Sequence, residues 1–136
     1  MPEKPSIQVA AALIENEGRY LITRRNEGVH LGGLWEFPGG KCEAGESFES
    51  CVQRELLEEL GIEITQPQFF MTLHHEYPEK IVELQFYSCS IHRGEPRAWG
   101  CAEFCWVKPE EFLNYEFPPA DLPVLRRLFV MAENTA

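Results

Sequence analysis

Residues 40–62, GKCEAGESFESCVQRELLEELGI, decide how this chain folds. After its opening glycine-containing segment, the stretch runs from residue 46 to residue 60 without glycine or proline. Ser47 is a suitable N-cap and Gly61 a suitable C-terminal stop, so the pattern predicts a loop followed by a helix. A period of 3.6 residues places three apolar side chains on one face of that helix, which we expect to pack on a core: Val52, Leu56 and Leu60.

Three carboxylates lie within one turn on a neighbouring face of the same helix: Glu55, Glu58 and Glu59. A solvated acidic face would explain them, but like charges four residues apart oppose helix formation by roughly 0.2–0.5 kcal/mol per pair. Only Arg54 offsets them locally. Clustered hard oxygen ligands suit Mg²⁺ or Mn²⁺, which can also bridge to substrate phosphates. The spacing therefore predicts a metal site.

The spacing of Gly40, Glu46 and residues 54–62 (RELLEELGI) matches every specified position of the Nudix hydrolase signature, so the chain resembles this family. Residues 33–41 (GLWEFPGGK) and 117–120 (FPPA) are similar to those of its MutT-like members. The resemblance implies one α/β domain over residues 1–136, a Nudix α/β/α sandwich with a mixed sheet between helices. It also implies hydrolysis of nucleoside triphosphates to monophosphate and pyrophosphate by water attack on the β-phosphorus.

The resemblance implies how the signature residues divide the chemistry. The metal ligands it implies are Glu55, Glu58, Glu59 and the carbonyl of Gly39. A Mg²⁺ ion, for which Mn²⁺ could substitute, is the expected cofactor. Either Glu55 or Glu58 orients or deprotonates the water, and the sequence does not distinguish them. We expect Arg54 to pair with a carboxylate of the box, Glu46 being the candidate, and so to act by positioning.

Outside the signature, the resemblance implies four nucleotide contacts: Arg25, His30, Phe37 and Asp121. Each of them could instead have a purely structural role. Arg25 could be a charge at a strand end, and His30 a surface histidine. Phe37 could be core, and Asp121 could cap a last helix. Further residues included among the expected substrate contacts are Glu36, Pro38, Gly39 and Lys80.

Two positions depart from the MutT-like pattern. Asp121 stands where an asparagine is expected, and an ionised carboxylate only accepts hydrogen bonds, whereas an amide also donates. It could therefore favour cytosine, which presents an amine; a protonated aspartate could still read an oxidised purine. Gly100 stands where a further metal-binding glutamate is expected, and Glu103 is a possible substitute. Oxidised nucleotides such as 8-oxo-dGTP are the first substrate hypothesis, and CTP, dCTP and 5-methyl-dCTP the second.

Composition limits the other functions. The chain has 136 residues and a formal net charge of −10 without a basic cluster, which argues against nucleic acid or membrane partners and against action on RNA 5′ ends. Five cysteines without a CxxC pair predict reduced thiols rather than a disulfide framework or zinc site. With no signal peptide or membrane span, a cytoplasmic protein is expected, monomeric or homodimeric. A catalytically silent nucleotide-binding regulator is the alternative of another class.

The rest of the chain predicts strands around this helix. Residues 6–15 and 19–24 read as a hairpin, and 35–38 as a short strand that leads into the signature loop. Residues 62–73 and 80–92 read as strands joined through 74–79, and 103–107 as another. A short helix is expected at 109–113 and a last one at 122–132, with three side chains directed inward: Leu125, Leu128 and Phe129.

Overall fold

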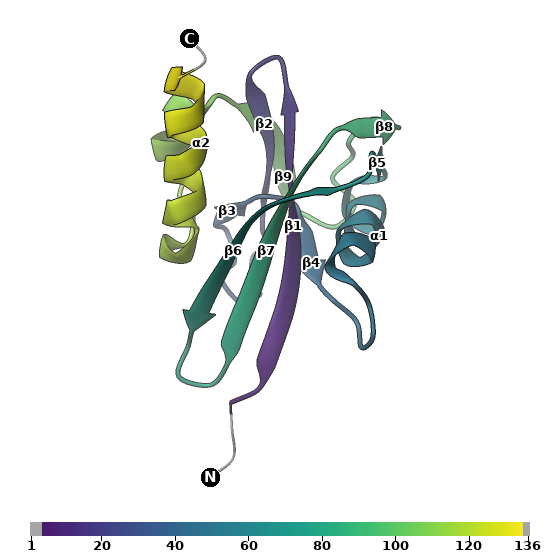
Figure 1. Ribbon diagram of the computed structural model, residues 1–136, viewed down its shortest axis with the longest axis vertical. Coiled ribbons are helices and arrows are strands. Elements are labelled where there is room, and N and C mark those ends of the chain that lie inside the picture. The colour runs from purple at the N-terminus through teal and green to yellow at the C-terminus, as the bar shows by residue number, and fades with distance from the viewer. Residues whose placement is uncertain (1–3, 135–136) are drawn as a thin grey trace.

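Residues 4–134 are described by the computed structural model, in which they form nine strands, two 3₁₀ helices and two α-helices (Figure 1). The strands are β1 (Ser6–Asn16), β2 (Arg19–Arg24), β3 (Trp35–Glu36), β4 (Gly39–Lys41), β5 (Glu63–Ile64), β6 (Gln68–Glu76), β7 (Ile81–Cys89), β8 (Ile91–Arg93) and β9 (Glu103–Val107). The helices are α1 (Phe48–Leu60), η1 (Pro109–Asn114), η2 (Pro119–Asp121) and α2 (Leu122–Asn134).

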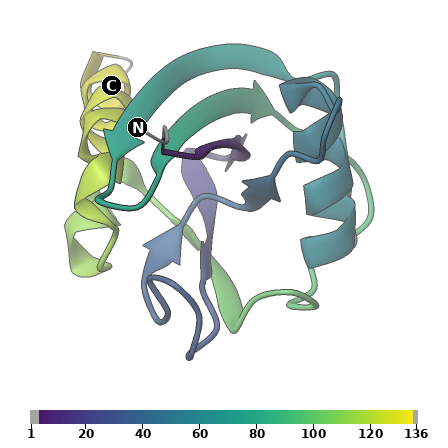
Figure 2. The same cartoon turned by 90° about the horizontal axis from the view of Figure 1, so that it is seen from below.

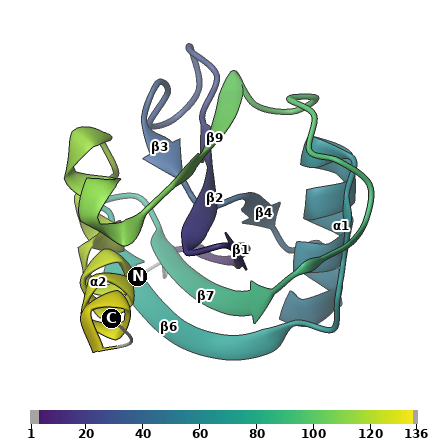
Figure 3. The same cartoon turned by 90° about the horizontal axis from the view of Figure 1, so that it is seen from above.

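Strand β1 is the centre of a mixed seven-stranded sheet of order β3-β2-β1-β7-β6. It runs parallel to β7 over nine residue pairs and antiparallel to β2 and β4, while β9 pairs with β2. The remaining strands, β5 and β8, form a separate small ribbon. The sheet lies between α1 and α2 (Figures 2 and 3). The predicted α/β sandwich with a mixed sheet is therefore confirmed.

The side chains of β1 alternate between two hydrophobic cores. Ala10, Ala12 and Ile14 pack with the apolar face of α1. Ala11 and Leu13 point to the opposite face, where they pack in the cluster that contains the buried residues of α2. Because successive strand residues face opposite sides, an almost continuously apolar strand is what a sheet covered on both faces requires.

Helix α1 forms as its sequence predicts. The Ser47 hydroxyl accepts a hydrogen bond from the backbone N–H of Ser50 at 3.1 Å, which caps the helix. Gly61 ends it with φ of 70°, a left-handed conformation that favours glycine. The predicted apolar face is fully buried, with Val52, Leu56 and Leu60 each at 0% exposure.

Several local predictions differ from the structure. The predicted strands 62–73 and 80–92 are each divided in two, into β5 and β6 and into β7 and β8. Strand β6 extends to Glu76, so residues 74–76, predicted to be part of a connection, pair with β7 instead. In α2, Phe129 is 42% exposed, and Val124 takes the inward position beside Leu125 and Leu128. Gly39 is a strand residue of β4. Neither α-helix within residues 4–134 combines the length and apolar character needed to span a bilayer.

Candidate active site

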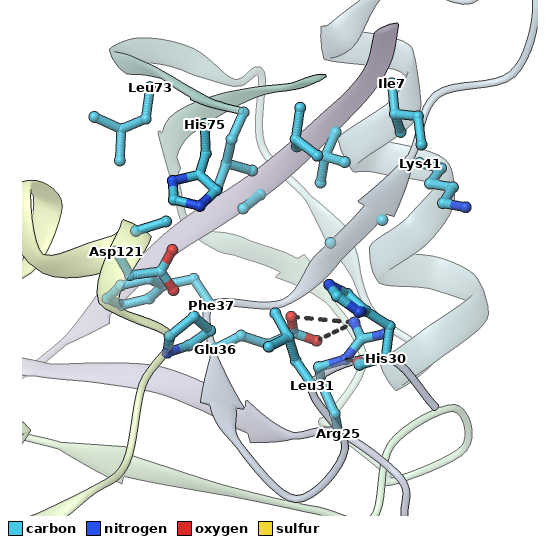
Figure 4. A pocket seen from close by; sticks show the side chains of 18 of the residues that line it. Ile7, Arg25, His30, Leu31, Glu36, Phe37, Lys41, Leu73, His75 and Asp121 are labelled. Atoms are coloured by element: carbon cyan, nitrogen blue, oxygen red, sulfur yellow. Dashed lines mark hydrogen bonds and ion pairs between the residues drawn. The ribbon is translucent and has the colours of Figure 1, made fainter. Parts of the chain in front are cut away.

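A pocket of about 270 Å³ opens on the face of the sheet next to the signature loop (Figure 4). Strands β1, β6 and β7 form one wall, and the loop before β3 and the segment around η2 contribute to the others. Seven of the eight predicted substrate contacts line it: Arg25, His30, Glu36, Phe37, Gly39, Lys80 and Asp121. The structure thus gathers residues that lie almost 100 positions apart in the sequence.

Pro38 is the predicted contact that does not line this pocket. It is buried between the loop and β1, where its carbonyl oxygen accepts a hydrogen bond from the backbone N–H of Ala12 at 2.8 Å. Because this bond continues the pairing of the loop with β1, Pro38 anchors the backbone that carries its neighbours. The assignment of Pro38 as a direct contact is therefore not supported by its position.

Gly39 and Gly40 allow two close approaches that side chains would prevent. A Cβ at Gly39 would lie 2.0 Å from the Ala10 carbonyl oxygen, so glycine is needed for β4 to pair with β1 here. A Cβ at Gly40 would lie 2.1 Å from Oε2 of Glu55. The Glu55 carboxylate therefore rests directly on the backbone of the signature loop.

Arg54 links the signature loop to α1. Its Nε and Nη2 donate to the two carboxylate oxygens of Glu46 at 2.8 and 2.9 Å. This bidentate ion pair is the predicted pairing of Arg54 with Glu46. Nη1 of Arg54 donates to Glu58 at 3.1 Å and to Glu55 at 3.4 Å, and Nη2 also donates to the carbonyl of Lys41 at 3.0 Å. Hydrogen bonding to Arg54 lowers the pKa of Glu46 to about 2. Arg54 thus fixes the orientation of several box carboxylates at once.

Glu36, Glu55 and Glu59 lie near enough to one another for their charges to interact, and we call these three residues the acidic cluster. Desolvation raises the pKa of Glu59 to about 8, with further contributions from the charges of Glu36 and Glu55. Burial is also the largest cause of the raised pKa values of Glu36 and Glu55. The Arg25 guanidinium, 3.3 Å from Glu36, opposes the rise there. Carboxylates held together in this way favour the approach of a cation.

Glu58 is placed differently from the other two glutamates of its predicted triad. Its side chain is 59% exposed, and its carboxylate accepts from Arg54. Within residues 4–134 no three acidic, histidine or cysteine side chains are grouped as a metal site would require. The three carboxylates are therefore not arranged as one ligand set: Glu58 shares Nη1 of Arg54 with Glu55 and lies at the surface. A ligand role for Glu58 stays a prediction.

Glu103, the possible substitute for the ligand missing at Gly100, has another partner. Its carboxylate accepts from Arg24 Nη2 at 2.9 Å, and its side chain is 53% exposed. Gly100 itself lies against the end of α1, where its N–H donates to the carbonyl of Glu59 at 2.9 Å. The structure therefore gives Glu103 an ion pair across β2 and β9 in place of the predicted metal contact.

Asp121 and Phe37 line the inner part of the pocket. Asp121 is 6% exposed, and desolvation, assisted by the charge of Glu36, raises its pKa to about 7. Among residues 4–134 no hydrogen bond joins its carboxylate to the amides of α2, so its position does not support the helix-cap explanation. Phe37 is a core residue, since it is 3% exposed and packs edge-on against Phe86 and Phe112. It also lines the pocket, and its contact with a nucleotide stays a prediction.

Most of the pocket wall lies on β6 and β7, at positions that the sequence did not predict as substrate contacts. The apolar residues there alternate with outward-facing ones, and this period of two was the signal available. His75 and Tyr77 were assigned to a connecting segment, yet both line the pocket, with their rings in edge contact at 4.4 Å. Lys41, one residue beyond the glycines of the loop, lines it as well.

Residues 9–127 of the chain match the family model of the NUDIX domain, which covers most of its length. The chain belongs to the Nudix family. It is 38% identical to the 8-oxo-dGTP diphosphatase of Haemophilus influenzae over 97% of this chain and 98% of that protein. It is 37% identical to the CTP pyrophosphohydrolase of Escherichia coli over 92% of this chain and 93% of that protein. The crystal structure of the MutT protein from Methanosarcina mazei superposes with a TM-score of 0.81, at 32% identity and 99% and 98% coverage.

The donor set of the Nudix loop and helix fits a hard divalent cation. It offers carboxylate oxygens and backbone carbonyls, which suit Mg²⁺ or Mn²⁺. Burial and neighbouring carboxylates raise the pKa values of Glu55 and Glu59. A cation beside them would offset this effect, because it favours their ionised forms. The residues that could hold it are those predicted from the sequence: Gly39, Glu55, Glu58 and Glu59.

Proposed function

We propose that this Nudix hydrolase is a Mg²⁺-dependent nucleoside triphosphate pyrophosphohydrolase that removes oxidised nucleotides such as 8-oxo-dGTP from the nucleotide pool. The observation that carries the proposal is a largely apolar pocket that Glu36, Gly39 and Gly40 line, with the Glu55 carboxylate against the backbone of Gly40. A nucleobase suits the apolar wall, and a triphosphate chain can reach the cluster. The 8-oxo-dGTP diphosphatase of Haemophilus influenzae, which shares 38% of its residues with this chain, supports this choice of substrate.

In this proposal each group has a defined part. Glu55 and Glu59 would hold the cation with the carbonyl of Gly39, and Arg54 keeps the box carboxylates in place. When bound, Mg²⁺ supplies Lewis-acid activation of the phosphate and neutralises developing charge. Glu55 or Glu58 accepts the proton of the water that attacks the β-phosphorus. The bond from the β-phosphorus to the oxygen that bridges it to the α-phosphorus breaks, so nucleoside monophosphate leaves with that oxygen and the water oxygen stays in pyrophosphate. Asp121 and Phe37 hold the base, and Arg25, held by Glu36, adds positive charge beside the phosphates.

The test is release of pyrophosphate from a panel that contains 8-oxo-dGTP, dGTP, dCTP, CTP and 5-methyl-dCTP, with Mg²⁺ or Mn²⁺ and with chelator. The proposal predicts metal-dependent turnover with 8-oxo-dGTP at the highest kcat/KM. Absence of turnover with every nucleotide in the presence of either metal would refute it.

A cytosine nucleotide is the second candidate, and Asp121 is the observation that favours it. An ionised Asp121 accepts from the exocyclic amine of cytosine, whereas its protonated form donates as well. The E. coli CTP pyrophosphohydrolase, 37% identical to this chain, supports this alternative. With a pKa near 7, Asp121 supplies both forms close to neutral pH. Higher kcat/KM for dCTP or CTP than for 8-oxo-dGTP would establish this alternative.

A silent regulatory module is the remaining alternative. Calorimetry and kinetics on Glu55→Gln and Glu59→Gln separate it from an enzyme. The proposed enzyme loses rate by orders of magnitude and keeps nucleotide binding, whereas a regulator would show no turnover even in the unmodified chain. Action in the cytoplasm, on free nucleotides and not on nucleic acid, is part of the proposal.

A further inference from the structure

One polar side chain interrupts the apolar sheet wall of the pocket. Three strands contribute eight lining residues within the described part of the chain: Ile7, Val9, Ala11, Leu73, His75, Val82, Leu84 and Phe86. The register sets them in rows across the sheet, Val9 beside Leu84 beside Leu73 in one, and Ile7 beside Val82 beside His75 in the next. Seven of the eight are apolar and offer a base no hydrogen bond, so they do not fix its position along the wall. His75 is the position at which the wall offers a hydrogen bond.

The ring of His75 is held in place while its nitrogens stay available. Tyr77 contacts it edge-on at 4.4 Å and contacts the ring of His30 at 5.5 Å on its other side. Among residues 4–134, no hydrogen bond or ion pair engages the imidazole of His75. The side chain is exposed and lines the cavity, and its ring is directed toward the carboxylate of Asp121 (Figure 4). Two polar groups from distant parts of the sequence thus line the same space.

We propose that His75 is a specificity-determining residue, which hydrogen-bonds the edge of the nucleobase together with Asp121. The inference rests on the proposed function and adds to it which residues read the base. An imidazole offers one donor and one acceptor nitrogen, and the carboxyl of Asp121 adds an acceptor or a donor. A base edge placed between them meets a defined pattern of partners, while its faces contact apolar side chains. A base that lacks the matching groups would leave both of these polar groups unpaired.

The variant that tests this role is His75→Phe, which keeps the ring against Tyr77 and removes both nitrogens. His74→Phe is its matched control. His74 precedes it on β6, is exposed on the opposite face of the strand, and does not line the pocket. Both changes convert a histidine on the same strand to the same residue, so an effect on folding of β6 would appear in both variants.

The assay is kcat/KM over the nucleotide panel for the unmodified chain and both variants. We expect His75→Phe to lower kcat/KM for the preferred nucleotide roughly 3- to 10-fold, the effect of one net hydrogen bond, mainly through KM. The preference over the other bases falls by the same factor, and His74→Phe stays within about twofold of the unmodified chain. An unchanged preference in His75→Phe, or an equal change in both variants, would overturn the proposal.

Binding of nucleoside monophosphates separates this inference from the proposed function. Calorimetry with 8-oxo-dGMP, dGMP and CMP in the absence of metal measures reading of the base without hydrolysis. If the chain turns over no nucleotide, the proposed function fails, yet selective monophosphate binding that is weakened in His75→Phe and not in His74→Phe would still support His75. Equal affinity of all three proteins for each monophosphate, or no binding by any, would overturn the role of His75 independently of catalysis.

Discussion

Replacing Gly40 by alanine is predicted to impair catalysis without unfolding the protein. The added Cβ would lie 2.1 Å from Oε2 of Glu55, against 3.4 Å for ordinary contact, so the carboxylate must move by about 1.3 Å. Gly40 does not have a positive φ, so alanine can adopt its backbone conformation. A misplacement of about 1 Å at a catalytic group can cost about 100-fold in rate. We therefore expect kcat to fall about 100-fold while the melting temperature stays near that of the unmodified chain.

The neighbouring glycine provides the contrast. In Gly39→Ala the Cβ meets backbone, 2.0 Å from the Ala10 carbonyl oxygen, which cannot swing aside as a carboxylate can. This variant should lose stability, by on the order of 1–3 kcal/mol or more, because β4 must separate from β1. The assays are urea denaturation and steady-state pyrophosphate release. Catalysis at the unmodified rate by Gly40→Ala would refute the proposed use of the Glu55 carboxylate.

A double-mutant cycle sharpens the same test. If Gly40→Ala acts only by displacing Glu55, its effect should largely vanish in a Glu55→Gln background, where the displaced group is already inactive. Full additivity of the two losses in kcat would show that the alanine acts through another part of the loop.

Three further predictions concern other parts of the account. Arg54→Lys removes the bidentate ion pair with Glu46 and should lower kcat about 10- to 100-fold with a small change in melting temperature. Steady-state kinetics and calorimetry measure the two effects, and an unchanged kcat would contradict a positioning role for Arg54. Asp121 has a folded pKa of about 7, above its ordinary value of 3.8, so its stabilising contribution is complete below pH 3.8 and is lost as pH rises toward 7. Asp121→Asn should therefore raise the melting temperature above pH 7 more than at pH 4, and should shift preference toward oxidised guanine if this residue reads the base; a pH-independent difference would contradict the burial argument. Leu56→Ala, at a side chain with 0% exposure, should cost about 2–5 kcal/mol in urea denaturation, whereas Leu57→Ala at 50% exposure should cost less than about 0.5 kcal/mol; equal losses would contradict the assigned helix face.

Local signals made α1 predictable from the sequence. The cap at Ser47, the stop at Gly61 and the apolar spacing between them depend on residues within one or two turns of each other. The pairing of Arg54 with Glu46 was also predictable, because the loop between them is short. The same holds for most strands, whose apolar pattern does not depend on their partners.

Positions of strands and side chains that depend on residues distant in the sequence could not be predicted from such local signals. Residues 74–76 are polar and look like a connection, but their pairing with β7 continues the strand and brings His75 to the pocket. Glu58 follows the spacing of a metal ligand, yet the direction of its side chain depends on competition for Arg54. Pro38 lies between two predicted contacts, and only the hydrogen bond of its carbonyl to Ala12 shows that it serves the backbone.

The most direct test of the central claim is NMR of the isotope-labelled protein during titration with Mn²⁺, whose paramagnetism broadens signals of nearby nuclei. The account predicts that amide signals of the Gly39–Gly40 segment and of α1 around Glu55 and Glu59 broaden first. Mg²⁺ should reverse the effect by competition, and Glu55→Gln together with Glu59→Gln should abolish it. Broadening centred elsewhere in the chain, or none at all around Glu55 and Glu59, would contradict a metal-binding role for this acidic helix.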